Sequence, residues 1–180
     1  MARPSTVVRV HRAVLDLVRE VGVDGLTMEG LAAAAGTGKQ TLYRSWSSPL
    51  HVLFDALLAS STADDGRVEV PDSGDLARDL RTLVDGIVDE LTEPAGDALM
   101  RDVLTRLQVH PELSAELQQR LLGPQTAAIA ERFRRAGVVD PEQVTELLLG
   151  PLFHRWLLRT GPFTDGWVRS HVELVLRAAG

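Results

Sequence analysis

Five polar side chains within six consecutive residues could bind nucleic acid. They are Lys39, Gln40, Thr41, Tyr43 and Arg44. Cationic side chains attract phosphates, and amide and hydroxyl groups can hydrogen-bond to phosphates and base edges. The segment therefore predicts a DNA-reading surface, although the solvated face of any helix can carry the same residue types.

Catalysis and metal binding are disfavoured by the spacing of the residues that could perform them. Four of the five histidines could be catalytic or metal-binding candidates, but they lie far apart in the sequence: His51, His110, His154 and His171. No His-x-x-x-His or Glu-x-x-His pair and no glycine-rich phosphate loop accompanies them. Cysteine is absent, which excludes disulfides and thiolate metal sites. We expect no metal, no cofactor and no enzymatic activity.

Two short helices joined by a tight turn are expected to position the polar segment. Thr27 is a suitable N-cap for the first helix. The small side chains of residues 32–35 let the two helices approach closely, and Gly36 permits the backbone to bend. The second helix, from about Gly38 to Trp46, would then present its polar residues to solvent. Any two-helix corner of an all-α protein can use glycine and alanine in this way.

The whole chain is predicted to be all-α, with about nine helices. Residues 6–21 carry apolar side chains at the spacing of an amphipathic helix, which Gly22 ends. Further helices are expected at 49–60, 75–92, 96–109, 111–136, 141–159 and 164–178. Pro124 should kink the helix at 111–136 near Gly123. Residues 62–74 are the best linker candidate.

Charge is distributed unevenly along the chain. The net charge is -6, yet residues 1–48 carry six basic and four acidic side chains. Electrostatic attraction is screened beyond roughly 10 Å, so this basic segment could bind phosphate despite the acidic remainder.

Hydrophobic residues make up 44 % of the chain, enough for a packed core. No apolar run reaches the about 20 residues needed to span a bilayer, and the N-terminus lacks the apolar core of a signal peptide. We expect a cytoplasmic protein with no membrane partner.

Residues 25–32, GLTMEGLA, and residues 35–44, AGTGKQTLYR, resemble the DNA-binding domain of the TetR family of regulators. The Thr-Leu-Tyr triplet after an Ala-Gly turn is the most specific part, and the likeness extends from residue 13 to residue 54. In the C-terminal half, residues 110–113 and 148–152 resemble the ligand-binding domains of actinobacterial members. The resemblance implies an N-terminal three-helix helix-turn-helix domain at 1–48. It also implies a ligand-binding and dimerisation bundle at 49–180, with helix 49–60 connecting the two.

The resemblance implies a set of DNA contacts. Thr27 would cap its helix and reach a phosphate, Tyr43 would place its hydroxyl on a phosphate, and the start of the second helix would meet bases. The implied contact residues are Arg3, Thr27, Thr37, Gly38, Lys39, Gln40, Thr41, Tyr43 and Arg44.

Several positions depart from the family's usual pattern. Gly38 stands where the family usually has serine or a similar cap, which should weaken the N-cap of the second helix. Gln40 replaces a frequent glycine, and Pro49 replaces the lysine that commonly opens the fourth helix. One phosphate contact should therefore be missing, unless Arg3 or Arg44 supplies it.

Apolar residues of the C-terminal bundle are expected to line a ligand pocket and to form a homodimer interface. The pocket would be mainly hydrophobic, because few fixed charges fall among its residues. The candidate pocket residues are Leu83, Ile87, Leu99, Val103, Leu107, Phe133, Phe153 and Trp156. The two last helices carry more apolar surface than one face can bury, which suggests burial against a second copy. The candidate interface residues are Leu149, Phe153, Leu157, Trp167, Val168, Val172 and Leu176.

The expected function is DNA-binding transcriptional regulation. We expect a repressor that a small, mainly hydrophobic effector releases from double-stranded operator DNA. One alternative is a constitutive DNA-binding dimer without a ligand. The other is a helical adaptor that binds only protein, which would give no salt-sensitive DNA binding.

Overall fold

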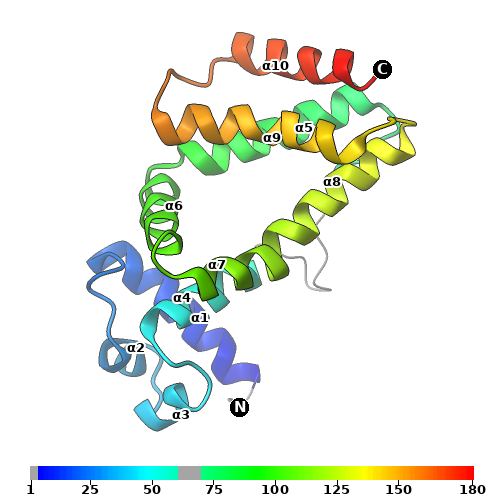
Figure 1. Cartoon of the computed structure of the whole chain (residues 1–180). Helices are drawn as coiled ribbons and strands as arrows, with labels where there is room; N and C mark the ends of the chain where they lie inside the picture. Colours follow the sequence, from blue (N-terminus) through cyan, green and yellow to red (C-terminus); the bar gives the residue numbers. More distant parts are fainter. Residues whose placement is uncertain (1–3, 61–69) are drawn as a thin grey trace. The chain divides into compact units, whose positions relative to one another are not determined.

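The computed structural model describes residues 4–60 and 70–180, and its described residues form α-helices with one π-helical segment. Arg3 and residues 61–69, which include most of the expected linker, lie outside the described residues. The helices, labelled in Figure 1, are α1 (Pro4–Val21), α2 (Met28–Ala34), α3 (Lys39–Tyr43), α4 (Pro49–Ser60), α5 (Leu76–Thr92), α6 (Pro94–Leu107), α7 (Pro111–Leu117), η1 (Gln118–Leu122), α8 (Gly123–Arg135), α9 (Pro141–Leu158) and α10 (Asp165–Ala178).

The predicted all-α fold is confirmed. In the part of the chain that the structure describes, α7, η1 and α8 follow one another without a break, so the helices form nine runs, as expected. The expected helix at 111–136 contains its irregularity where the sequence predicts one. Its π turn, Gln118–Leu122, directly precedes Gly123 and Pro124. Because proline has no N–H to donate, the regular hydrogen-bond pattern cannot continue through it, and a wider turn lies beside it.

The first of two compact units comprises residues 1–66 and 98–121. Within it, α1 packs on α4 and α2, α2 packs on α3, and α4 packs on α7. The apolar stripe of α1 supplies Val10 and Val14 to the core, where they meet Leu31 of α2, Leu42 of α3 and Phe54 of α4. All five are almost fully buried. This core fixes the positions of α2 and α3.

The second unit comprises residues 67–97 and 122–180. Its helices α5, α8, α9 and α10 enclose a core that includes Val84, Phe133, Leu148 and Val175. Figure 1 shows α10 running alongside α9 and α5, with which it is in contact. None of the helices that the structure describes is both long enough and apolar enough to span a membrane.

A buried ion pair lies within this second unit. Arg132 of α8 donates two hydrogen bonds to Asp79 of α5, at 2.9 and 2.7 Å. The backbone N–H and the hydroxyl of Ser73 also donate to Asp79, at 3.0 and 2.7 Å. Burial alone would raise the pKa of Asp79, but the hydrogen bonds from Ser73 and Arg132 outweigh it and lower the pKa. The pair is therefore charged and fully hydrogen-bonded in the folded chain.

Candidate nucleic-acid interface

The N-terminus of α2 begins at a threonine cap, as the sequence predicts. Thr27 has an extended backbone, and its hydroxyl oxygen accepts a hydrogen bond from the N–H of Gly30 at 3.0 Å. Since this bond uses only the oxygen, the hydroxyl proton can still be donated to a phosphate. Gly25, just before the cap, is tightly constrained: a Cβ there would lie 2.4 Å from the carbonyl oxygen of Val21. A side chain at this position would displace the end of α1.

The turn between α2 and α3 has a defined hydrogen-bond pattern. Gly36 has a left-handed backbone (φ 59°), and its N–H donates to Ala33 O at 3.2 Å. The N–H of Thr37 donates to Ala32 O at 2.9 Å. These two bonds form a Schellman motif, which uses the last free carbonyls of α2 and favours glycine at the left-handed position. The turn sets the angle at which α3 leaves α2.

Helix α3 separates its apolar side chain from its polar ones. Leu42 is fully buried and anchors the helix to the core. Lys39, Gln40, Tyr43 and Arg44 are exposed, and Tyr43 has 56 % of its surface accessible. Thr41 and Thr37 are half-buried. Gly38 occupies the N-cap position and provides no side-chain hydrogen bond to the helix. The structure therefore places seven of the expected contact residues on α3 and the residues directly beside it, and Thr27 at the start of α2; Arg3 lies outside the described residues.

An ion pair joins α3 to α2. The ammonium of Lys39, the first residue of α3, lies 2.5 Å from Oε1 of Glu29 in α2. The hydrogen bond from Lys39 is the main reason why the pKa of Glu29 is lowered. Sequence reasoning did not find this pair, because helical spacing relates residues on one helix and not across a turn.

A second polar cluster, also missed from the sequence, ties α4 to its neighbours. Asp55 of α4 accepts hydrogen bonds from His11 Nε2 at 3.0 Å, from Trp46 Nε1 at 3.0 Å and from Arg120 Nη2 at 3.1 Å. The hydrogen bond from His11 is the largest cause that holds the pKa of Asp55 well below its usual range, and it acts against partial burial. Asp55 thus links α1, the segment after α3 and the π turn η1.

Replacing Asp55 by asparagine should lower the free energy of unfolding by about 1–2 kcal/mol near pH 7, because the bonds from His11 and Arg120 lose their charged acceptor. Since the folded pKa of Asp55 lies below its unfolded value of about 3.9, its contribution is complete above that value. It is lost as the pH falls toward the folded pKa. Denaturant unfolding at pH 7 and pH 3 should show the difference between wild type and D55N shrinking at the lower pH. An equal difference at both values would contradict the assigned role.

The residues expected to line a pocket are distributed over both units. Leu99, Val103 and Leu107 belong to the core of the first unit, whereas Leu83, Ile87, Phe133, Phe153 and Trp156 belong to the second unit. Trp156 is buried and donates a hydrogen bond from Nε1 to Asp97 Oδ1 at 2.6 Å.

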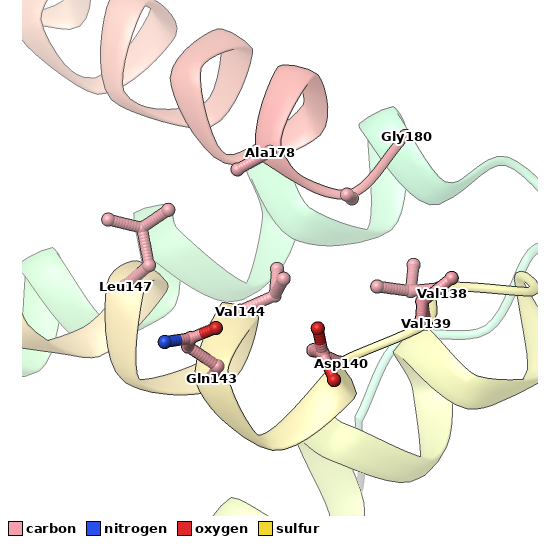
Figure 2. A pocket seen from close by; sticks show the side chains of 9 residues that line it. Val138, Val139, Asp140, Gln143, Val144, Leu147, Ala178 and Gly180 are labelled. Atoms are coloured by element: carbon pink, nitrogen blue, oxygen red, sulfur yellow. The ribbon is translucent and has the colours of Figure 1, made fainter.

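An open hollow in the second unit lies elsewhere (Figure 2). It has a volume of about 400 Å³ and is formed by the segment before α9, the first turns of α9 and the end of α10. Its lining includes Val139, Val144 and Leu147. None of the eight expected pocket residues lines it, and the expected effector pocket stays a prediction.

The residues expected at a dimer interface differ in exposure. Phe153 and Leu157 of α9 are 39 % and 49 % exposed, whereas Val168 and Val172 of α10 are buried in the core of the second unit. Leu149, Trp167 and Leu176 are half-buried. Three exposed leucines on the same two helices were not among the candidates: Leu147, Leu158 and Leu174.

Comparisons with known proteins extend over both units. Residues 12–49 match the family of bacterial regulatory proteins described as the tetR family, and residues 70–175 match the tetracyclin repressor-like C-terminal domain. The chain is 31 % identical over 179 residues to the uncharacterized HTH-type transcriptional regulator YdeS of Bacillus subtilis, covering 93 % of this chain and 87 % of that protein. It is 29 % identical over 167 residues to the DNA-binding transcriptional repressor TetR of Mycobacteroides abscessus, covering 89 % and 85 %. The crystal structure of the TetR family transcription regulator SCO0332 is similar with a TM-score of 0.79 and 26 % identity, covering 97 % of this chain and 98 % of that one.

Proposed function

Because the chain belongs to the TetR family of transcriptional regulators, whose members bind DNA and are not enzymes, we propose that it represses transcription as a homodimer on operator DNA. The observation that carries the proposal is the exposed polar face of α3 beside the capped start of α2. Repression is supported by the name of the Mycobacteroides abscessus relative. The protein would act in the cytoplasm, and a small, mainly hydrophobic effector would release it from DNA.

In the proposed complex, α3 is the recognition helix and lies in the major groove. Gln40 is suited to a bidentate hydrogen bond with adenine. Lys39 and the hydroxyl of Tyr43 would bind phosphates, and the hydroxyl of Thr27 would bind a phosphate from the start of α2. The short length of α3, Lys39–Tyr43, limits the number of base pairs that one copy can read. Two copies on an inverted repeat would supply the missing specificity.

Replacing Lys39 by alanine or Tyr43 by phenylalanine should each weaken binding to a duplex selected from a random pool by about five- to tenfold, since each change removes one phosphate contact. K39A should also reduce the slope of log affinity against log salt concentration by about one, because one phosphate contact is lost. Titration of labelled duplex at several salt concentrations measures both effects. R78A removes an exposed cation of α5, outside the proposed DNA-binding and dimer surfaces, and serves as the control, which should bind like wild type. Wild-type affinity in the K39A/Y43F double variant would overturn the assignment of α3.

The proposed dimer interface is formed by α9 and α10. Large apolar side chains are exposed on both helices, among them Phe153, Leu157 and Leu174. Exposed apolar surface of this kind is typical of a face that a second subunit covers. Val168 and Val172 are left out of the proposed interface, because the core of a single chain already buries them.

The proposed route of effector action passes through α4. This helix starts six residues after α3 ends, and Asp55 holds it to Trp46, which lies in the connecting segment. Arg120 of η1 donates a hydrogen bond to the same carboxylate. A shift of the helical run α7–η1–α8 would therefore also move α4. A small rotation of α4 in each subunit would misplace both recognition helices, which need a spacing of about 34–36 Å.

Coupling between the effector and DNA is reciprocal, so operator DNA should weaken effector binding by the same factor by which the effector weakens DNA binding. Equal effector affinities with and without operator DNA would instead indicate a constitutive DNA-binding dimer.

A further inference from the structure

We propose that Glu29 restrains DNA binding by holding Lys39 in an ion pair that DNA must displace. This inference rests on the proposed function, because it requires that Lys39 binds DNA. It adds a residue that sets the strength of binding without contacting DNA itself.

The geometry of the pair fits a contact that opens on binding. Glu29 is the second residue of α2 and Lys39 is the first residue of α3, so the intervening turn brings the two side chains together. Their charged groups are 2.5 Å apart, and the side chains of Lys39 and Glu29 are 54 % and 58 % exposed. An exposed pair has little desolvation to overcome, and it can therefore separate without disturbing the fold.

Two other acidic residues near the proposed DNA-binding helices pair with residues outside α3. Asp16 pairs with Arg19 on its own helix, and Asp24 pairs with Arg106 of α6. Glu29, in contrast, pairs with a residue of the proposed recognition helix. The negative charge of Glu29 thus offsets the positive charge of Lys39, which the proposed phosphate contact requires.

The pair should weaken binding to every sequence to a similar extent. A lysine held by a carboxylate presents little net charge to an approaching phosphate, so the phosphate must replace the carboxylate. Because the opposed contact is to phosphate and not to a base, operator and random DNA are affected alike. Glu29 would therefore limit the affinity for both.

Replacing Glu29 by glutamine keeps the shape of the side chain and removes its charge. E29Q should bind the selected duplex and a random duplex about two- to fivefold more tightly than wild type at low salt. For E29Q, the logarithm of the affinity should fall more steeply with the logarithm of the salt concentration, with a slope larger by up to about one. The gain in affinity should therefore shrink as the salt concentration is raised. E20Q, which removes one charge from an exposed glutamate near the end of α1, is the matched control and should show no comparable gain. Thermal unfolding of each variant confirms that the fold is retained.

The same substitution in the K39A background decides whether Glu29 acts through Lys39. If it does, E29Q/K39A should bind DNA no more tightly than K39A alone. An equal gain in both backgrounds would overturn the proposal, since Glu29 would then act on DNA directly. The absence of any gain from E29Q in the wild-type background would overturn it as well. A K39A variant that binds like wild type would instead refute the proposed contact of Lys39, and this inference with it.

Discussion

Replacing Arg132 by alanine should lower the melting temperature by roughly 10 °C. Arg132 and Asp79 are each less than 5 % exposed, and Arg132 donates two hydrogen bonds to the carboxylate of Asp79. Removing the guanidinium leaves a charged carboxylate inside the second unit with only the hydrogen bonds from Ser73. An uncompensated buried charge of this kind is among the most destabilising results of a single substitution.

Thermal unfolding followed by circular dichroism measures this effect. Arg134 of the same helix, α8, provides the control: it also forms ion pairs, with Glu131 and Glu142, but its side chain is 50 % exposed. R134A should therefore change the melting temperature little. A loss for R132A as small as that for R134A would show that the buried pair does not stabilise the second unit.

Replacing Leu157 by glutamate should convert the proposed dimer into a monomer and reduce DNA affinity by at least a hundredfold. Leu157 lies on α9 with 49 % of its surface exposed, so a charge there leaves the core intact. In the dimer the same charge would be buried between two apolar faces, at a cost of several kcal/mol. Every 1.4 kcal/mol weakens association tenfold. A monomer would present one α3 helix and lose the second half-site.

Light scattering at micromolar concentration measures the mass of each variant. Val109 is 70 % exposed and lies outside α9 and α10, so V109E places the same charge on an apolar position away from the proposed interface. V109E should remain dimeric. Substitution at Val172 would be a poor test, because this residue is 5 % exposed within a single chain and a charge there would unfold the protein. A monomeric wild type, or a dimeric L157E, would contradict the proposed interface.

Local features of the fold could be predicted from the sequence because they depend on neighbouring residues. The cap at Thr27 and the end of α2 at Gly36 follow from hydrogen bonds within a few residues, and both are confirmed. The irregular turn before Pro124 follows from the missing N–H of proline, and the structure places a π turn there. Such signals predict where helices begin and end to within a few residues. Helix α3, for example, is Lys39–Tyr43, which is shorter than the expected 38–46.

Features that depend on distant residues could not be predicted in this way. Asp55 joins His11 and Arg120, which are 44 and 65 residues away in the sequence. Helical periodicity shows which face of α10 is apolar, but it does not show what covers that face. Val168 and Val172 were therefore expected at a dimer interface, whereas α10 packs them against helices of its own unit. The pairing of Glu29 with Lys39 likewise depends on the angle that the turn at Gly36 imposes.

Selection of duplexes from a random pool tests the central claim, that a dimer reads DNA through two α3 helices, most directly. The wild-type protein should enrich an inverted repeat whose half-sites are centred about one helical turn, 34–36 Å, apart. The K39A/Y43F variant should enrich no such repeat under the same salt conditions. Recovery of no preferred sequence by the wild type, or of a single half-site without its inverted copy, would contradict the account.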